Sequence, residues 1–211
     1  MDRKIFYDVI RPSLFKGTLT GKQVEGIEAI LNEWEKQALT DTRWLAYILA
    51  TAYHETAKTM QPIEEFGKGK GRDYGKKLKM GGGPGKRLPY TTPDKFYYGR
   101  GHTQNTWYEI YDALTKAAAK KGHDWDFLNQ PELLLTMEPS IWATYYAMQN
   151  GLYTGRRLLV YFNDTTEDWV NARKIINGLD CADLIAGYGK TFYAALKQAN
   201  VASTVQPGSP V

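Results

Sequence analysis

The sequence predicts a predominantly helical α+β protein with two lobes, the smaller one a β or loop lobe at about residues 60–100. Two observations support this fold class. Apolar residues recur at helical spacing along most of the chain. Residues 67–95 interrupt this pattern with a stretch rich in glycine, lysine and arginine. With 211 residues, of which 43% are hydrophobic, we expect one globular domain over 1–199 and a flexible tail over 200–211.

The first two helices have clear sequence signals. Thr20 and Gln23 have the spacing of a capping box, and apolar residues follow at helical intervals, so a helix is expected over about 20–37. A second helix is expected from about residue 40 or 41 to residue 56. It carries one apolar stripe, formed by Leu45, Ile48, Leu49 and Ala52.

The segment 67–95 is expected to be a long loop with one short hairpin that ends at 95–98. A loop of this length in a compact domain is usually functional or mobile, whereas its basic residues are more often solvated surface. Helical patterns return after Gly101. The helices expected there cover about 105–120, 139–150, 155–162, 166–177 and 181–198.

Net charge and cysteine content limit the classes of partner and the cellular compartment that we expect. The net charge of +4 fits a polyanionic partner such as peptidoglycan or nucleic acid and does not choose between them. A single cysteine, Cys181, excludes an intrachain disulfide, so the fold must hold in a reducing cytoplasm by core packing. Neither a signal peptide nor a transmembrane segment is expected. The many aromatic residues suit stacking on sugar rings, although most are expected in the core.

Glu55 is the first candidate catalytic residue. It continues the apolar stripe of the second helix three residues beyond Ala52, at the C-terminal end of that helix. Partial burial and the negative end of the helix dipole both disfavour a charged carboxylate. A carboxyl group that keeps its proton is what a glycosidase needs as general acid. Position alone leaves the alternative open, namely a structural ion pair with a nearby arginine.

Two further groups of candidates follow Glu55. Glu64 and Glu65 offer the second carboxylate, which activates water in an inverting glycosidase or acts as nucleophile in a retaining one. Adjacent acids in a loop are, however, often mere surface. The segment YYGRGHTQNT combines glycines, which let the backbone approach a ligand, with Gln104 and Thr106, which can bond water or sugar hydroxyls. Its alternative reading is a turn that leads into a helix.

The remaining polar motif is Asn177-Gly178, which is either an ordinary helix stop or an amide aimed into a cleft, suited to an acetamido group. Several other site classes are excluded. The HExxH zinc motif fails because Lys58 replaces its second histidine, and the glycine-rich stretch lacks the Ser or Thr of a P-loop. No G-x-S-x-G elbow occurs. We therefore expect neither a metal nor another cofactor.

Four segments, in order, resemble glycoside hydrolase family 19, which holds chitinases and many phage and prophage endolysins. They are AYHETAKTMQPIEE, YYGRGHTQNT, residues 129–133 and ARKIINGLDCADLIAGYGKTFYAAL, and together they cover about residue 44 to residue 198. The chain departs from the family where His102-Thr103 replaces an apolar pair before Gln104. It also lacks the disulfides and the longer loop between the two acids that plant chitinases have.

The resemblance implies a lysozyme-like fold and an inverting mechanism with no metal and no covalent intermediate. It assigns the general acid to Glu55 and the second acid to Glu64, with Glu65 kept as the alternative, and it places Thr106 beside the attacking water. The loop 67–95 would close over the cleft. The residues expected to contact substrate are His54, Glu65, Tyr98, Arg100, Gln104 and Asn177.

We therefore expect a peptidoglycan-degrading endolysin of the muramidase type, which cleaves the β-1,4 bond between N-acetylmuramic acid and N-acetylglucosamine. A chitinase is the first alternative. The second is a non-catalytic wall- or nucleic-acid-binding module that uses the basic run 67–87; only Tyr74 interrupts this run, which disfavours single-strand binding. The expected protein is a monomer without nucleic-acid partners or stable membrane association. It would be made in the bacterial cytoplasm and reach the cell wall after holin-type release.

Overall fold

The structure, a computed structural model, describes residues 1–81, 83 and 85–204. About 53% of the chain is helical and the strands are few and short. The predicted α+β class with a predominance of helices is therefore confirmed. Within the described residues, the buried apolar side chains form two separate clusters, one in each of two lobes.

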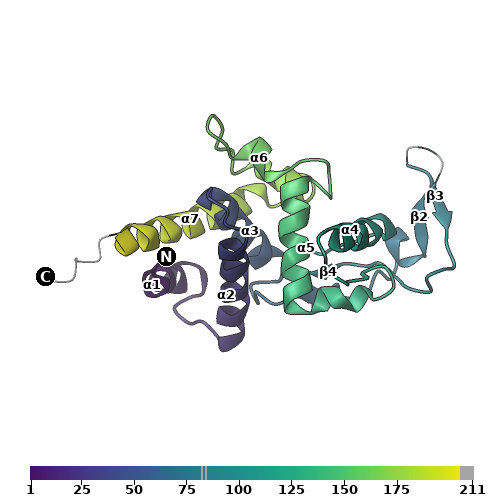
Figure 1. Cartoon of the computed structure of the whole chain (residues 1–211), viewed down its shortest axis with the longest axis horizontal. Helices are drawn as coiled ribbons and strands as arrows, with labels where there is room; N and C mark the ends of the chain where they lie inside the picture. The colour runs from purple at the N-terminus through teal and green to yellow at the C-terminus, as the bar shows by residue number, and fades with distance from the viewer. Residues whose placement is uncertain (82, 84, 205–211) are drawn as a thin grey trace, which may run out of the picture.

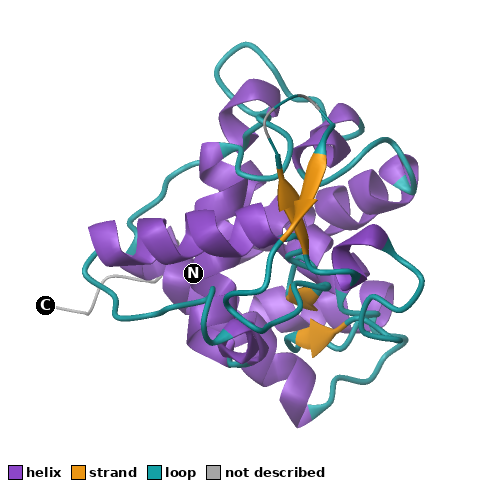
Figure 2. Cartoon of the chain, turned by 90° about the vertical axis from the view of Figure 1, so that its right-hand side faces the viewer, coloured by secondary structure: helices purple, strands orange, loops and turns teal. Residues whose placement is uncertain are grey.

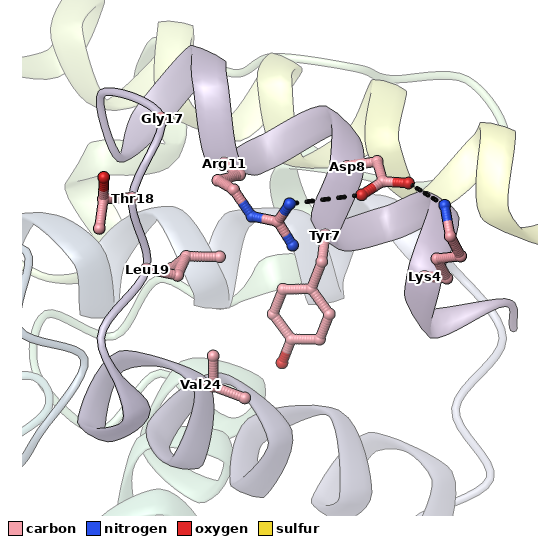
Figure 3. A pocket seen from close by; sticks show the side chains of 8 residues that line it. All are labelled: Lys4, Tyr7, Asp8, Arg11, Gly17, Thr18, Leu19 and Val24. Atoms are coloured by element: carbon pink, nitrogen blue, oxygen red, sulfur yellow. Dashed lines mark hydrogen bonds and ion pairs between the residues drawn. The ribbon is translucent and has the colours of Figure 1, made fainter.

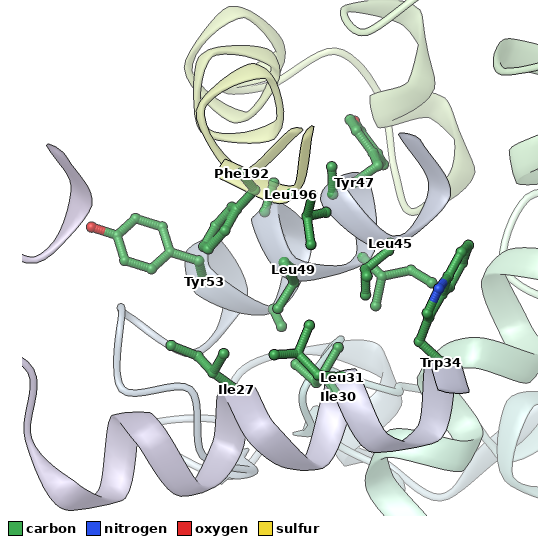
Figure 4. Packing of buried hydrophobic residues seen from close by; sticks show 14 of the residues in the cluster. Ile27, Ile30, Leu31, Trp34, Leu45, Tyr47, Leu49, Tyr53, Phe192 and Leu196 are labelled. Atoms are coloured by element: carbon green, nitrogen blue, oxygen red, sulfur yellow. The ribbon is translucent and has the colours of Figure 1, made fainter. Parts of the chain in front are cut away.

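The larger lobe is a helical assembly. It consists of α1 (Arg3–Leu14), α2 (Gly21–Lys36), α3 (Thr42–Glu55) and α7 (Ala182–Thr204), which lie together on one side of the molecule (Figure 1). Figure 4 shows how α2, α3 and α7 bury their apolar stripes against one another. The labelled core residues are Ile27, Ile30, Leu31, Trp34, Leu45, Tyr47, Leu49, Tyr53, Phe192 and Leu196.

The starts of α2 and α3 follow the sequence signals. Thr20 and Gln23 form the predicted capping box, with both reciprocal hydrogen bonds present. Asp41 caps α3 by accepting a hydrogen bond from the backbone N–H of Arg43 at 3.0 Å. These caps satisfy backbone donors that a helix cannot satisfy by itself, which is why both helices begin where they do.

No helix is predicted before residue 20, and α1 corrects that omission. Its Pro12 argues against a helix because proline lacks the N–H that would bond the carbonyl four residues earlier. The residue concerned, Asp8, lies on the exposed side of α1, where water can bond its carbonyl. Phe6 and Ile10, one helical turn apart, are fully buried and hold α1 on the core.

The smaller lobe has its own core around α4 (Tyr108–Lys120) and the 3₁₀ helix η2 (Pro131–Leu135). Two antiparallel strand pairs belong to it. One joins β1 (Ile63–Glu64) to β4 (Arg100–Gly101), and a hairpin joins β2 (Leu78–Met80) to β3 (Arg87–Pro89). In Figure 2 the side of the molecule that carries this hairpin faces the viewer. A short 3₁₀ helix, η1 (Asp73–Gly75), precedes it.

The hairpin is therefore not where the sequence analysis placed its end, at residues 95–98. The strands that pair are 78–80 and 87–89 instead. Residues 97 and 98 enter the lobe's core: Tyr97 is fully buried and its hydroxyl donates to the carbonyl of Leu128 at 2.8 Å. Burial of the Tyr97 ring in this core accounts for the position of the segment.

Helix α5 (Met137–Asn150) lies between the lobes and contributes to both cores. Its Tyr145 and Met148 belong to the larger core, whereas Trp142 and Ala143 belong to the smaller one. A helix buried on several sides explains why its sequence shows no clear polar face.

The last third of the chain differs from the prediction in three places. The expected helix 166–177 is only a 3₁₀ turn, η3 (Asn171–Ile175), because residues 162 and 167 form an isolated β-bridge and Asp168 accepts a hydrogen bond from the N–H of Asn171. The expected helix 155–162 shortens to α6 (Leu158–Tyr161). Helix α7 passes the expected domain end at 199 and runs through Thr204, and the rest of the expected tail, 205–211, lies outside the described residues.

His102, in the turn after β4, contacts Ser140 of α5 and the backbone of Met60 in the segment between α3 and β1. Its backbone N–H donates to Ser140 Oγ at 3.0 Å, and its ring Nδ1 lies 2.8 Å from the same oxygen. Ser140 can then donate to a neutral ring whose Nε2–H faces the carbonyl of Met60, 3.4 Å away. Burial lowers the pKa of this fully enclosed imidazole to about 4.

We predict that this histidine makes the fold sensitive to mild acid. Because the folded pKa lies below the unfolded value of about 6.5, the unfolded chain takes up the proton first, and stability falls as pH drops from about 6.5 to about 4, by at most about 3 kcal/mol. Denaturant unfolding at pH 7 and pH 4.5 measures this loss. His102→Asn should remove most of it, whereas His123→Asn, outside this network, should keep it. An unchanged pH dependence in His102→Asn would contradict the assignment.

Candidate active site

A cavity of about 610 Å³ opens between the two lobes. Its walls come from the end of α3 and from η3 in the larger lobe, and from the hairpin and the start of α4 in the smaller lobe. Four of the residues predicted from the sequence line it, namely Glu55, Gln104, Thr106 and Asn177. The fold thus brings together segments that are far apart in the chain.

Glu55 lies at the last position of α3 with its side chain only 16% exposed. Its Oε1 accepts a hydrogen bond from Arg173 Nη1 at 2.6 Å. Among the described residues, no hydrogen bond uses its Oε2. The position is therefore partly buried as the apolar stripe indicates, but the neighbour is a guanidinium and not the apolar wall expected from the sequence.

Arg173 is the main residue of this site that the sequence analysis did not assign. Its side chain is 5% exposed because η3 carries it between the buried Ala172 and Ile175. The guanidinium is shared: it also donates to the backbone carbonyl and to the carboxylate of Asp180, both at 3.2 Å. An arginine inside an apolar segment was the available signal, since a buried guanidinium needs a carboxylate partner.

The loop before α4 has a strained backbone. Gln104 and Trp107 both have positive φ angles, +51° and +76°, which cost about 1–3 kcal/mol each in a residue other than glycine. Gln104 Nε2 donates to the carbonyls of Ile63 and Gly101, and Thr106 Oγ1 donates to the carbonyl of Gln104 at 2.8 Å. These bonds fix the polar side chains along the cavity wall.

The cavity also has a hydroxyl chain that the sequence did not reveal. Thr103 Oγ1 lies 2.6 Å from the hydroxyl of Tyr153, which in turn donates to Asn105 Oδ1 at 2.8 Å. Burial raises the pKa of Tyr153, so the phenol stays neutral. Thr103 and Tyr153 line the cavity and offer it polar but uncharged groups.

Aromatic and charged side chains form the small-lobe wall. The rings of Tyr74 and Trp107 meet edge to face at 5.5 Å, and the guanidinium of Arg87 lies 3.5 Å from the centre of the Trp107 ring. Glu109 at the start of α4 pairs with Arg87 at 2.9 Å and also accepts the backbone N–H of Met80. Glu109 therefore attaches both strands of the hairpin to α4 beside the cavity.

Glu64, the last residue of β1, and Glu65, the residue after it, have different hydrogen-bond partners, as expected when neighbouring side chains of an extended segment point to opposite sides. Glu65, directly after the strand, accepts the hydroxyl of Tyr74 at 2.7 Å and the N–H of Gly99 at 3.2 Å, and Tyr74 lines the cavity. Glu64 bonds instead to Lys68 at 2.9 Å and to the hydroxyl of Tyr98 at 3.0 Å. The hydrogen bond from Lys68 lowers the pKa of Glu64 most, and the hydrogen bond from the Tyr98 hydroxyl lowers it further.

Not all predicted substrate-binding residues meet the cavity. Tyr98 and Arg100 lie on the Glu64 side of the strand pair and line a separate hollow. His54, in the last turn of α3, is partly buried and does not line the cavity. Glu55, Gln104, Thr106 and Asn177 therefore line the interlobe cavity, and Tyr98 and Arg100 line the separate hollow. The predicted residues His54, Glu64 and Glu65 line neither.

Residues 1–81, 83 and 85–204 contain neither a cluster of metal-binding side chains nor a helix able to cross a membrane. No group of three or more His, Cys, Asp or Glu side chains there is placed to hold a metal ion. No helix in the same residues is long and apolar enough to cross a bilayer.

A further hollow of about 480 Å³ lies between α1 and α2 (Figure 3). Asp8 pairs there with Lys4 at 2.6 Å and with Arg11 at 3.6 Å, so its charges satisfy one another on the surface. It holds none of the residues predicted from the sequence. The interlobe cavity is therefore the candidate active site.

Comparison of the sequence with models of known protein families and with curated protein sequences found no match.

Proposed function

We propose that this protein is a lysozyme-like glycoside hydrolase that cleaves the β-1,4-linked backbone of peptidoglycan with inversion at the anomeric carbon. The observation that carries the proposal is the placement of Glu55, a largely buried carboxyl group in a cavity between two lobes. Arg173 holds its Oε1, and no hydrogen bond among the described residues uses its Oε2. The resemblance of AYHETAKTMQPIEE and YYGRGHTQNT to family 19 supports the same residues.

Glu55 would act as the general acid through Oε2. Arg173 fixes Oε1 and thereby orients the carboxyl group, while Asp180 draws part of the guanidinium's charge away from Glu55. When a sugar fills the cavity it displaces water, and loss of water favours the protonated carboxyl. The proton then passes from Oε2 to the glycosidic oxygen as the bond from that oxygen to the anomeric carbon breaks.

The second acid would activate water. Glu65 suits this role better than Glu64, because its neighbour Tyr74 lines the cavity whereas Glu64 is engaged by Lys68 on the far side. The water oxygen bonds to the anomeric carbon opposite the leaving group, and its proton passes to the Glu65 carboxylate. Thr106 would help to orient this water. Overall, one water is added across one glycosidic bond.

The cavity wall fits an N-acetylated sugar. Trp107 and Tyr74 offer apolar faces for a ring, and Asn177 offers an amide for an acetamido group. Chitin presents the same rings without the lactyl ether, so a chitinase is the alternative. We propose that the enzyme acts on the bacterial wall as an endolysin, reaching it after holin-type release.

The products decide between the two polymers. Purified peptidoglycan and colloidal chitin are incubated separately with the protein, and the new reducing ends are identified by mass spectrometry. We expect soluble fragments that end in reducing N-acetylmuramic acid from peptidoglycan and little release from chitin. Early NMR spectra should show the α-anomer first, since inversion of a β-link yields it. Release from chitin alone would select the alternative, and release from neither would refute the proposal.

A further inference from the structure

The separate hollow that Tyr98 and Arg100 line has a volume of about 500 Å³. It lies on the smaller lobe, across the β1–β4 strand pair from Glu65. We call it the basic hollow. Among the described residues it is lined by four cationic side chains and two carboxylates, together with the rings of Phe96 and Tyr98. The cationic residues are Lys68, Lys70, Lys95 and Arg100, and the acidic ones are Asp94 and Glu132.

Arg100 gives this hollow a fixed, buried guanidinium. The residue is 6% exposed, and its Nη1 donates to the carbonyl of Phe96 at 2.9 Å and to the hydroxyl of Tyr111 at 3.0 Å. The guanidinium stacks on the Tyr98 ring, 3.6 Å from its centre. None of the hydrogen bonds among the described residues uses its Nε or Nη2, and none of the ion pairs found there includes it.

An arginine held in this way is preorganised to bind an anion. A guanidinium held on one edge and stacked on a ring loses little freedom when its remaining N–H groups bind a carboxylate or phosphate. The carboxylate of Glu64, its cross-strand neighbour, attracts this cation without bonding to it, because that carboxylate bonds Lys68 and Tyr98 instead. An anionic ligand that bonds the guanidinium directly would offset part of the cost of burying it. The part of the structure that holds Arg100 thus has a chemical reason to bind a negative group.

Two of the three lysines around Arg100 are not neutralised by an ion pair within the described residues. Lys68 is paired with Glu64, and Asp94 is paired with Lys77 outside the hollow. Lys70 and Lys95 form no ion pair within residues 1–81, 83 and 85–204. Both stand at the rim, where they can approach a ligand held by Arg100.

We infer that the basic hollow binds an anionic group of the cell-wall polymer, a carboxylate or a phosphate, outside the cleavage site. The inference rests on the proposed function for its choice of polymer. Peptidoglycan carries carboxylates on its peptide stems, and many walls carry attached phosphodiester polymers. Phe96, exposed beside the lysines, adds an apolar surface for the chain that bears the anion. The hollow would hold the enzyme on the wall while the cavity cuts the sugar backbone.

The test measures binding to purified walls by sedimentation at low temperature, so that turnover does not enter. The wild type is compared with Lys70→Glu/Lys95→Glu and with a matched control, Lys190→Glu/Lys197→Glu, two exposed lysines of α7 with the same change in net charge. We expect the rim variant to bind roughly three- to tenfold more weakly and the control to bind like the wild type. Arg100→Lys, which keeps the charge but removes the planar fork, should also weaken binding, with folding checked by circular dichroism.

Treated walls identify the anion. Amidation of wall carboxyl groups should abolish the difference between wild type and rim variant if a stem carboxylate is the ligand; removal of phosphate polymers with hydrofluoric acid should do so if a phosphate is. Equal binding by wild type, rim variant and control would overturn the inference, as would rim-dependent binding of DNA in place of walls. Hollow-dependent binding by a protein that cleaves neither polymer would refute the hydrolase proposal and leave the binding site standing.

Discussion

Replacing Glu55 by Gln should lower the rate of wall hydrolysis by about 10²–10⁴-fold, the usual contribution of a general acid. Glutamine has the same shape and can still accept the Arg173 hydrogen bond at Oε1, but it has no acidic proton at the Oε2 position. Arg173 also keeps Asp180 as a partner, so the fold should persist. The fall in turbidity of purified walls measures the rate, and circular dichroism and thermal unfolding verify the fold.

The same assay tests the second acid with a matched pair. Glu65→Gln should slow hydrolysis strongly because its carboxylate would take the proton from water, whereas Glu64→Gln removes an ion pair to Lys68 on the other side of the strand pair. A strong loss with Glu64→Gln and a mild one with Glu65→Gln would reverse these roles. A Glu55→Gln protein that lyses walls at close to the wild-type rate would end the hydrolase proposal.

The position of Glu55 could be predicted, but its chemical surroundings could not. A helical stripe of apolar residues specifies the face on which a side chain lies, and Glu55 is indeed largely buried on that face. Its partner, Arg173, comes from a segment 118 residues later in the chain. Local periodicity contains no information on such a contact. The segment that carries Arg173 is also a short 3₁₀ helix and not the longer helix expected over 166–177.

The separation of the YYGRGHTQNT and PIEE residues onto the two sides of the β1–β4 pair has a similar cause. Sequence proximity suggests one site, but side chains alternate across the β1–β4 pair, so Glu64 and Arg100 face one way and Glu65 the other. The capping box at Thr20 was predictable because all its atoms lie within four residues. Helix α1 was missed since Pro12 dominated its local signal while Phe6 and Ile10 are held by packing.

Replacing Gly26 by Ala should destabilise the protein by about 3 kcal/mol, at the upper end of the usual cost of overpacking. A Cβ at this position of α2 would stand 1.7 Å from the carbonyl oxygen of Met60 and 2.8 Å from its carbonyl carbon. Both are backbone atoms, so no side-chain rotation can relieve the clash. The segment around Met60 must instead move away from α2, and urea unfolding measures the loss of stability.

Activity should fall together with stability, because this segment joins Glu55 to β1. It is held in an unusual backbone form, with positive φ angles at Ala57, Lys58 and Met60, and the Met60 carbonyl is also the contact of the His102 ring. Gly187→Ala in α7 is the matched control: nothing lies within 4 Å of its added Cβ, so it should stabilise the helix by up to about 1 kcal/mol. If Gly26→Ala unfolded like the wild type, close packing of α2 against residues 57–60 could not be what holds Glu55 and Glu65 in their relative positions.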